Sequence, residues 1–264
     1  MYFYVDESGH TGPNLCDADQ PLLYYGVLSS RVNVDVVVES PVASLRKRLG
    51  VSHLHGAELG IRGLTEIAPQ VVRLVKQFDL RLDVYRVAKR DHAIICFFDQ
   101  VFDQGVNPAV TWTGYWTPMR YVLLIKLAAL FDEKLAMLAW DARIDPKDAT
   151  ALPKMQEVCR ELRSRVGMLP DARSRQLISD VLYWAEVNPT EISYNVPSKR
   201  DMLQVTPNVI GFQSVMHGIA RRLRSNGRRA ARIVVDQQSQ FNKAQQTLAG
   251  WYQNARGLKA PMGP

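Results

Sequence analysis

The strongest constraint on the fold is an apolar segment at the start of the chain that leads directly into two acidic residues. Residues 2–5 are Tyr, Phe, Tyr and Val, and no polar residue interrupts them. Such a run predicts a β-strand buried on both faces of a sheet. Asp6 and Glu7 follow it, and residues 8–13 have the composition of a turn. The sequence therefore places two carboxylates at the end of a strand, where open α/β sheets usually have their sites.

A second apolar run, late in the sequence, repeats this design. Residues 233–235 are Ile, Val and Val, and they lead into Asp236. A carboxylate at the end of a buried strand is costly to desolvate unless a metal ion, a proton or an ion pair accompanies it. If the two strands are parallel neighbours, Asp6 and Asp236 lie at the same edge of the sheet. We expect this pair to be the centre of any functional site.

Periodicity predicts the remaining elements near the two ends of the chain. Residues 22–28 are predicted to form a second strand, antiparallel to the first, and the period-two alternation of residues 80–87 predicts a half-exposed strand. Apolar residues at helical spacing predict helices over residues 41–49, 64–78 and 209–223, the last of them ending at Ser225-Asn226-Gly227.

The middle of the chain has an overwhelmingly helical pattern. Residues 121–140 are predicted to form one long helix, and Pro146, Pro153 and Pro170 are expected to divide the following residues into shorter helices. A brief strand is expected at residues 192–196 and a last helix at 243–252. This order predicts an α/β fold in which residues 1–264 form one domain with a mixed sheet and a large helical insertion at residues 91–190.

Composition restricts the class of protein. The formal net charge of +7 and the pI near 9.4 favour a polyanionic partner such as nucleic acid. Three widely spaced cysteines without a C-x-x-C pair argue against a zinc knuckle or a disulfide framework. No leader segment and no apolar run of spanning length is present, so we expect a soluble, cytoplasmic protein without a membrane partner. Glycine-rich phosphate loops, G-x-S-x-G elbows and kinase motifs are absent from the sequence.

Three carboxylates, Asp6, Glu58 and Asp236, are the predicted catalytic and metal-binding residues. Hard divalent cations, Mg²⁺ or Mn²⁺, prefer carboxylate and water ligands, and a two-metal site of this kind hydrolyses phosphodiesters. The alternative is structural, because an Asp at a strand end often caps a turn or pairs with an arginine.

The segment His53-Leu54-His55-Gly56-Ala57-Glu58 also has a metal-like composition. It is not H-E-x-x-H, so its spacing does not match the zinc site of that protease class. We expect Glu58 to serve a magnesium site with His55 nearby. An ordinary surface or hydrogen-bonded role remains the alternative for either histidine.

A cluster of basic residues precedes the second apolar run. Its predicted nucleic-acid-binding members are Arg221, Arg222, Arg224, Arg228 and Arg229, and Arg232 follows them. Arginines in this position can grip phosphates near Asp236. The alternative is a solvated helix end, where arginine is favoured by the helix dipole.

Three motifs together resemble the domain-of-unknown-function family numbered 3800. They are Tyr-Val-Asp-Glu-Ser-Gly at residues 4–9, His-Gly-x-Glu-Leu at residues 55–59 and Val-Asp-Gln-Gln at residues 235–238. The resemblance implies a divergent ribonuclease H-like fold, found mostly in prokaryotes and associated with nuclease activity. It matches Asp6 to the first-strand metal ligand, Glu58 to a second carboxylate and Asp236 to the ligand on the neighbouring strand.

Two departures from that family are visible. Its members often have Asp-Glu-Gln where this chain has Asp236-Gln237-Gln238. Many also continue into a Leu-Gln-x-Ala-Asp helix that supplies a last carboxylate, a motif that the sequence up to Pro264 does not contain.

The resulting hypothesis is a nuclease that hydrolyses phosphodiesters with Mg²⁺ or Mn²⁺. Residues expected beside the metal ligands, or orienting the substrate, are Glu7, Ser8, His55 and Gln238. One alternative is a catalytically inert module that binds nucleic acid or a protein through the arginine cluster, and another is a small-molecule phosphohydrolase. The helical insertion is a candidate surface for a homo-oligomer or a protein partner.

Overall fold

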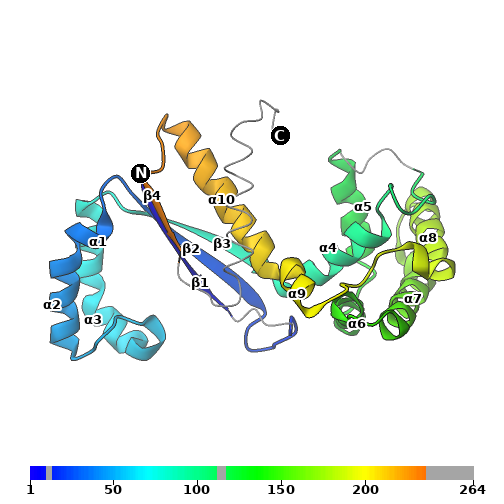
Figure 1. The fold of residues 1–264 in the computed structure, drawn as a ribbon, viewed down its shortest axis with the longest axis horizontal. Coiled ribbons are helices and arrows are strands. Elements are labelled where there is room, and N and C mark those ends of the chain that lie inside the picture. The colour runs from blue at the N-terminus through cyan, green and yellow to red at the C-terminus, as the bar shows by residue number, and fades with distance from the viewer. Residues whose placement is uncertain (10–13, 112–116, 236–264) are drawn as a thin grey trace. The chain divides into compact units, whose positions relative to one another are not determined.

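A computed structural model describes residues 1–9, 14–111 and 117–235, and these residues form an α/β structure with a four-stranded mixed sheet (Figure 1). The chain divides into two compact units. The sheet unit comprises Met1–Ser8, Tyr24–Tyr85 and the described residues from Phe212 onward, and the helical unit comprises Gly9–Leu23 and Arg86–Gly211. The α/β class expected from the sequence is confirmed. The prediction of a single domain with an insertion at 91–190 stays a prediction.

The sheet joins strands from opposite ends of the sequence. Its members are β1 (Tyr2–Ser8), β2 (Leu22–Ser30), β3 (Arg81–Ala88) and β4 (Arg232–Val235), in the spatial order β3-β2-β1-β4. β1 is antiparallel to β2 and parallel to β4, and both pairings confirm the expectation from the sequence.

β1 is buried on one face only, which corrects the prediction of a strand buried on both. Phe3 and Val5 are buried, but Tyr2 and Tyr4 on the opposite face are half-buried. Tyrosine suits such a position because its hydroxyl needs a polar partner, and the Tyr4 hydroxyl donates to Asn33 Oδ1 at 2.9 Å. The strand also continues to Ser8, so the acidic residues at positions 6 and 7 lie within it rather than after it.

Helix α10 (Pro207–Ser225) packs on the sheet unit through its part from Phe212 onward (Figure 1). Gly218 allows the close approach, because a Cβ atom there would lie 1.7 Å from the Tyr85 hydroxyl of β3. The predicted stop is confirmed: Gly227 has φ +59°, and the Arg228 N–H donates to the Leu223 carbonyl at 3.0 Å. This six-residue closure is the Schellman motif that ends many helices.

Three helices connect β2 to β3 in the sheet unit: α1 (Val34–Val37), α2 (Glu39–Leu49) and α3 (Gly56–Gln77). The helix predicted at 41–49 lies within α2, and the helix predicted at 64–78 overlaps α3, which ends one residue earlier with Phe78 as its C-cap. Both predictions are confirmed. Leu45 and Ile67 are the buried residues of these two helices. α3 is kinked near its start, where Gly60 has φ +58°.

The helical unit is built around one large apolar core. Its helices are α4 (Lys89–Val101), α5 (Met119–Ala128), α6 (Glu133–Ile144), α7 (Asp148–Arg165), α8 (Ala172–Val187) and α9 (Lys199–Met202), with short 3₁₀ turns at Val166–Met168, Pro189–Glu191 and Leu203–Val205. Phe97, Leu127, Ala139, Leu162 and Leu182 are fully buried in the core. The predicted helical character of the middle of the chain is confirmed.

Two helix boundaries differ from the prediction. Residues 121–140 are not one helix, because α5 ends at Ala128 and α6 begins at Glu133. The Asp132 side chain causes the new start, since it accepts a hydrogen bond from the Leu135 N–H at 2.8 Å as an N-cap. Pro146 and Pro170 lie between helices as expected, but Pro153 lies inside α7, where the buried Ala151 and Met155 hold the helix in the core.

The strand expected at residues 192–196 is absent. Instead, the Tyr194 N–H donates to the Ile192 carbonyl at 2.7 Å, which closes a tight turn. The Tyr194 hydroxyl donates to the Ala139 carbonyl of α6 at 2.8 Å and is fully buried. Tertiary packing against α6 therefore overrides the β-branched and aromatic composition of this segment. The helix predicted at 243–252 lies outside the described residues.

Gly9 fixes the turn that follows β1 and generates a first prediction. Its φ is +103°, and a Cβ atom would lie 2.4 Å from the Leu22 carbonyl oxygen. We expect Gly9→Ala to lower the free energy of unfolding by more than about 1 kcal/mol, because alanine tolerates neither the backbone angle nor the contact. Gly56→Ala is the control, since its Cβ would meet nothing within 4 Å. Urea unfolding measures both, and equal stability of the two variants would contradict the prediction.

Candidate functional site

Asp6 lies on the face of the sheet opposite Phe3 and Val5, and its side chain is exposed. Its Oδ1 accepts a hydrogen bond from the Glu7 N–H at 2.8 Å. It lines a shallow groove together with apolar residues of all four strands, among them Leu28, Leu82 and Val234. Among the described residues, no arginine or lysine forms an ion pair with this carboxylate. Asp6 is therefore an accessible carboxylate whose charge no described side chain compensates.

Glu7 points to the other face of the sheet and has a structural partner. It is paired with Tyr25 of β2 in the strand register, and the Tyr25 hydroxyl hydrogen-bonds to its carboxylate. Burial raises the pKa of the Tyr25 phenol, and the negative charge of Glu7 raises this pKa further. This pair keeps the phenol protonated as a donor and anchors the half of β1 that carries Asp6. Ser8, the last residue of β1, is exposed.

The register between β1 and β4 aligns the ends of the two apolar runs. Val5 is the partner of Val235 in the parallel ladder. Asp6 and Asp236 are the next residues in the sequence after these two partners. Asp236 and Gln238 themselves lie outside the described residues. The described part of the site is thus one accessible carboxylate beside the end of β4.

Glu58 and His55 lie together at the start of α3. His55 is the N-cap residue, and its Nδ1 lies 3.9 Å from Glu58 Oε1. Both side chains are largely exposed, at 64% and 70%. Within residues 1–9, 14–111 and 117–235, no group of three or more His, Cys, Asp or Glu side chains is placed to hold a metal ion. The structure therefore does not assemble Asp6 and Glu58 with a third described ligand, and the metal role of Glu58 stays a prediction.

The predicted arginine cluster divides between α10 and the loop that leads to β4. Arg222 is engaged with the sheet: its guanidinium donates to Ser29 Oγ and, at 2.9 Å, to Asp83 Oδ1. Arg232 lies 3.7 Å from Asp35 Oδ2. Arg221, Arg224, Arg228 and Arg229 are exposed.

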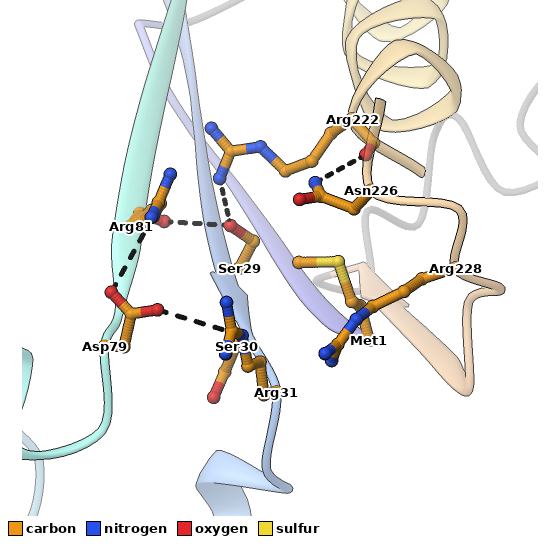
Figure 2. Close-up of a pocket in the computed structure, with 9 residues that line it drawn as sticks. All are labelled: Met1, Ser29, Ser30, Arg31, Asp79, Arg81, Arg222, Asn226 and Arg228. Carbon is orange, nitrogen blue, oxygen red and sulfur yellow. Dashed lines mark hydrogen bonds and ion pairs between the residues drawn. The ribbon is translucent and has the colours of Figure 1, made fainter. Parts of the chain in front are cut away.

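Arg222 and Arg228 also line a pocket that sequence reasoning missed (Figure 2). Arg31 and Arg81, from the end of β2 and the start of β3, face the same pocket, and Asp79 lies between them (Figure 2). Arg31, Asp79 and Arg81 belong to no recognisable sequence motif. Only the strand order, which places the end of β2 beside the start of β3, brings them together.

Comparison with known proteins found no matching family model, no matching curated protein and no matching solved structure. Within the described part of the chain, none of the helices combines the length and the apolar character needed to cross a membrane.

The Tyr25–Glu7 pair generates a second prediction. Tyr25 is 2% exposed, so Tyr25→Phe removes a buried hydroxyl donor from a carboxylate at the site. We expect a loss of about 1–3 kcal/mol in the free energy of unfolding. Tyr24→Phe is the matched control, because the neighbouring Tyr24 lies on the other face and is 37% exposed. Chemical denaturation of both variants is the measurement, and an equally small effect of both substitutions would show that the pair does not anchor β1.

Proposed function

We propose that the protein is a metal-dependent phosphodiesterase that hydrolyses nucleic acid, with a ribonuclease H-like sheet and a Mg²⁺ or Mn²⁺ site at Asp6 and Asp236. The observation that carries the proposal is the parallel ladder of β1 and β4, in which Val5 is the partner of Val235. The ladder makes the residues that follow, Asp6 and Asp236, the first candidates for a shared site at one edge of the sheet.

The topology supports the ribonuclease H-like part of the proposal. The sheet is mixed, as the proposed fold requires: in the strand order β3-β2-β1-β4, β1 is antiparallel to β2 and parallel to β4. In this protein two helical segments interrupt the sheet: α1 to α3 between β2 and β3, and α4 to α10 between β3 and β4.

The chemistry of Asp6 supports the metal-dependent part. Asp6 is an exposed carboxylate with no cationic partner in the described part of the chain. Such a group suits a hydrated divalent cation, because Mg²⁺ is usually held by one or two carboxylates and keeps several waters. When bound, such ions activate a water molecule and stabilise the leaving oxygen of a phosphodiester. In the proposed site, the Asp6 carboxylate binds the metal ion. The Tyr25–Glu7 pair on the opposite face of the sheet holds the strand that positions Asp6. Glu58 is proposed as a further metal ligand, and His55 is proposed to lie beside it.

The test is cleavage of labelled single-stranded RNA, single-stranded DNA and an RNA–DNA hybrid in the presence of Mn²⁺. We expect cleavage of at least one substrate that a chelator abolishes and that Asp6→Asn lowers by at least about 100-fold. Asparagine retains Oδ1 as an acceptor for the Glu7 N–H, so the fold should persist, and the unfolding midpoint should not change.

Asp180→Asn is the control for that experiment, because Asp180 is an exposed carboxylate on α8 in the helical unit. It should leave cleavage unchanged. Full activity of Asp6→Asn would refute the proposed site. Binding of nucleic acid by the wild type without cleavage in any metal would instead favour the catalytically inert binding module.

A further inference from the structure

The pocket in Figure 2 collects positive charge from four separate segments of the sheet unit. Arg31 follows β2, Arg81 begins β3, Arg222 belongs to α10, and Arg228 lies in the loop before β4. Four arginines from distant parts of the chain exceed what a helix end or a strand end requires.

The four guanidinium groups differ in how well their charge is neutralised. Arg222 is half-buried and lies 2.9 Å from Asp83 Oδ2, so it is a fixed part of the pocket wall. Arg31 and Arg81 share a single carboxylate: Asp79 lies 3.9 Å from Arg31 Nε and 3.8 Å from Arg81 Nε. Both contacts are longer than a hydrogen bond and largely exposed, so they are weak.

Arg228 carries the excess charge. Among the described residues, its guanidinium has neither a hydrogen bond nor an ion pair, and Figure 2 shows its side chain extending from the loop into the pocket. No described side chain therefore neutralises the charge of Arg228.

Asp79 has an unusual backbone conformation that links it to this pocket. It ends α3 in the left-handed region, with φ +47°, and the Leu80 N–H donates to the Val75 carbonyl at 3.0 Å as in a Schellman closure. Glycines occupy the equivalent positions after α2 and α10, Gly50 and Gly227. A residue other than glycine in this conformation costs about 1 kcal/mol. This conformation places the Asp79 carboxylate between Arg31 and Arg81. An anionic ligand of these two arginines would compete with Asp79.

We propose that this pocket binds a phosphate group, either free or at the end of a nucleic-acid strand. Guanidinium groups, each with several N–H donors in a planar fork, are the groups that most often recognise phosphate oxygens in proteins. The pocket has a volume of about 370 Å³ when its open mouth is included, which is large enough for a phosphate group.

The phosphate site is separate from the proposed metal site. Met1 lines the pocket, and Asp6 lies five residues further along β1. At a rise of ~3.3 Å per residue, this spacing corresponds to about 17 Å along the strand. A phosphate in the pocket therefore cannot reach Asp6, and the two sites occupy opposite ends of the same strand.

The experiment measures equilibrium binding without divalent metal, so that no cleavage occurs. Fluorescence anisotropy compares a short single strand with a 5′-phosphate, a 3′-phosphate or hydroxyl groups at both ends, and calorimetry measures inorganic phosphate. We expect a phosphorylated strand to bind more tightly than the strand with two hydroxyl ends. Arg228→Gln should weaken the binding of the phosphorylated strand by about tenfold, because a charge-assisted hydrogen bond is lost.

Asp79→Asn provides a change of opposite sign. It removes the competing carboxylate and keeps a residue that tolerates the left-handed conformation, so binding should tighten by about threefold. Arg62→Gln is the charge-matched control, because Arg62 is exposed on α3 and does not line the pocket. It should leave binding unchanged.

The arms of the experiment separate the two sources of phosphate and separate this site from the metal site. Binding of inorganic phosphate with the same pattern of variants would identify a free anion as the ligand, and a preference restricted to phosphorylated strands would identify a strand end. Asp6→Asn should keep the wild-type preference for a phosphorylated strand over a strand with hydroxyl ends. Equal effects of Arg228→Gln and Arg62→Gln, or no binding in either arm, would overturn the proposal.

Discussion

The parallel pairing of β1 with β4 is the interaction on which the rest of the sheet unit depends. It joins residues more than 200 positions apart, from Tyr2 beside Arg232 to Val5 beside Val235. The Ala231 N–H donates to the Met1 carbonyl at 2.7 Å and extends the contact. Parallel strands need a crossover connection, and here all the helices from α4 to α10 lie between β3 and β4. Loss of this pairing would separate α10 and the arginine-rich loop from the strand that carries Asp6.

The pairing also gives the sheet unit two chemically different ends. At the start of β1, the ends of neighbouring elements contribute arginines, and among the described residues Asp79, Asp83 and Asp35 lie close to them. Toward the end of β1, Asp6 contributes an accessible carboxylate. These charges would attract a polyanion such as nucleic acid to the first end and a divalent cation to the second. The two proposed sites, one for an anion and one for a cation, are thus far apart on one strand.

The sequence predicted those features that local pattern determines. Short apolar runs and one period-two alternation identified the four strands of the sheet, although β1 continues beyond its predicted end to Ser8. Helical spacing identified most helices. Features that depend on tertiary contacts were predicted wrongly or were not predicted. Asp132 caps the start of α6, so the helix that periodicity predicts as continuous is divided in two. The Tyr194 hydroxyl donates to α6, and the segment that was predicted as a strand packs against this helix instead. At the candidate sites, Asp6 was recognisable from its place after an apolar run. Arg31, Asp79 and Arg81 were not, because only the strand order brings isolated charges together.

The central claim is that Asp6 and Asp236 belong to one metal site, and a calorimetric titration with Mn²⁺ tests it without any assumption about the substrate. The wild type, Asp6→Asn and Asp236→Asn are titrated under identical conditions, with the unfolding midpoint of each variant as a check of the fold. We predict that the wild type binds Mn²⁺ and that each substitution abolishes this binding. Absence of binding in the wild type, or binding that neither substitution changes, would contradict the shared site and leave both carboxylates as structural residues.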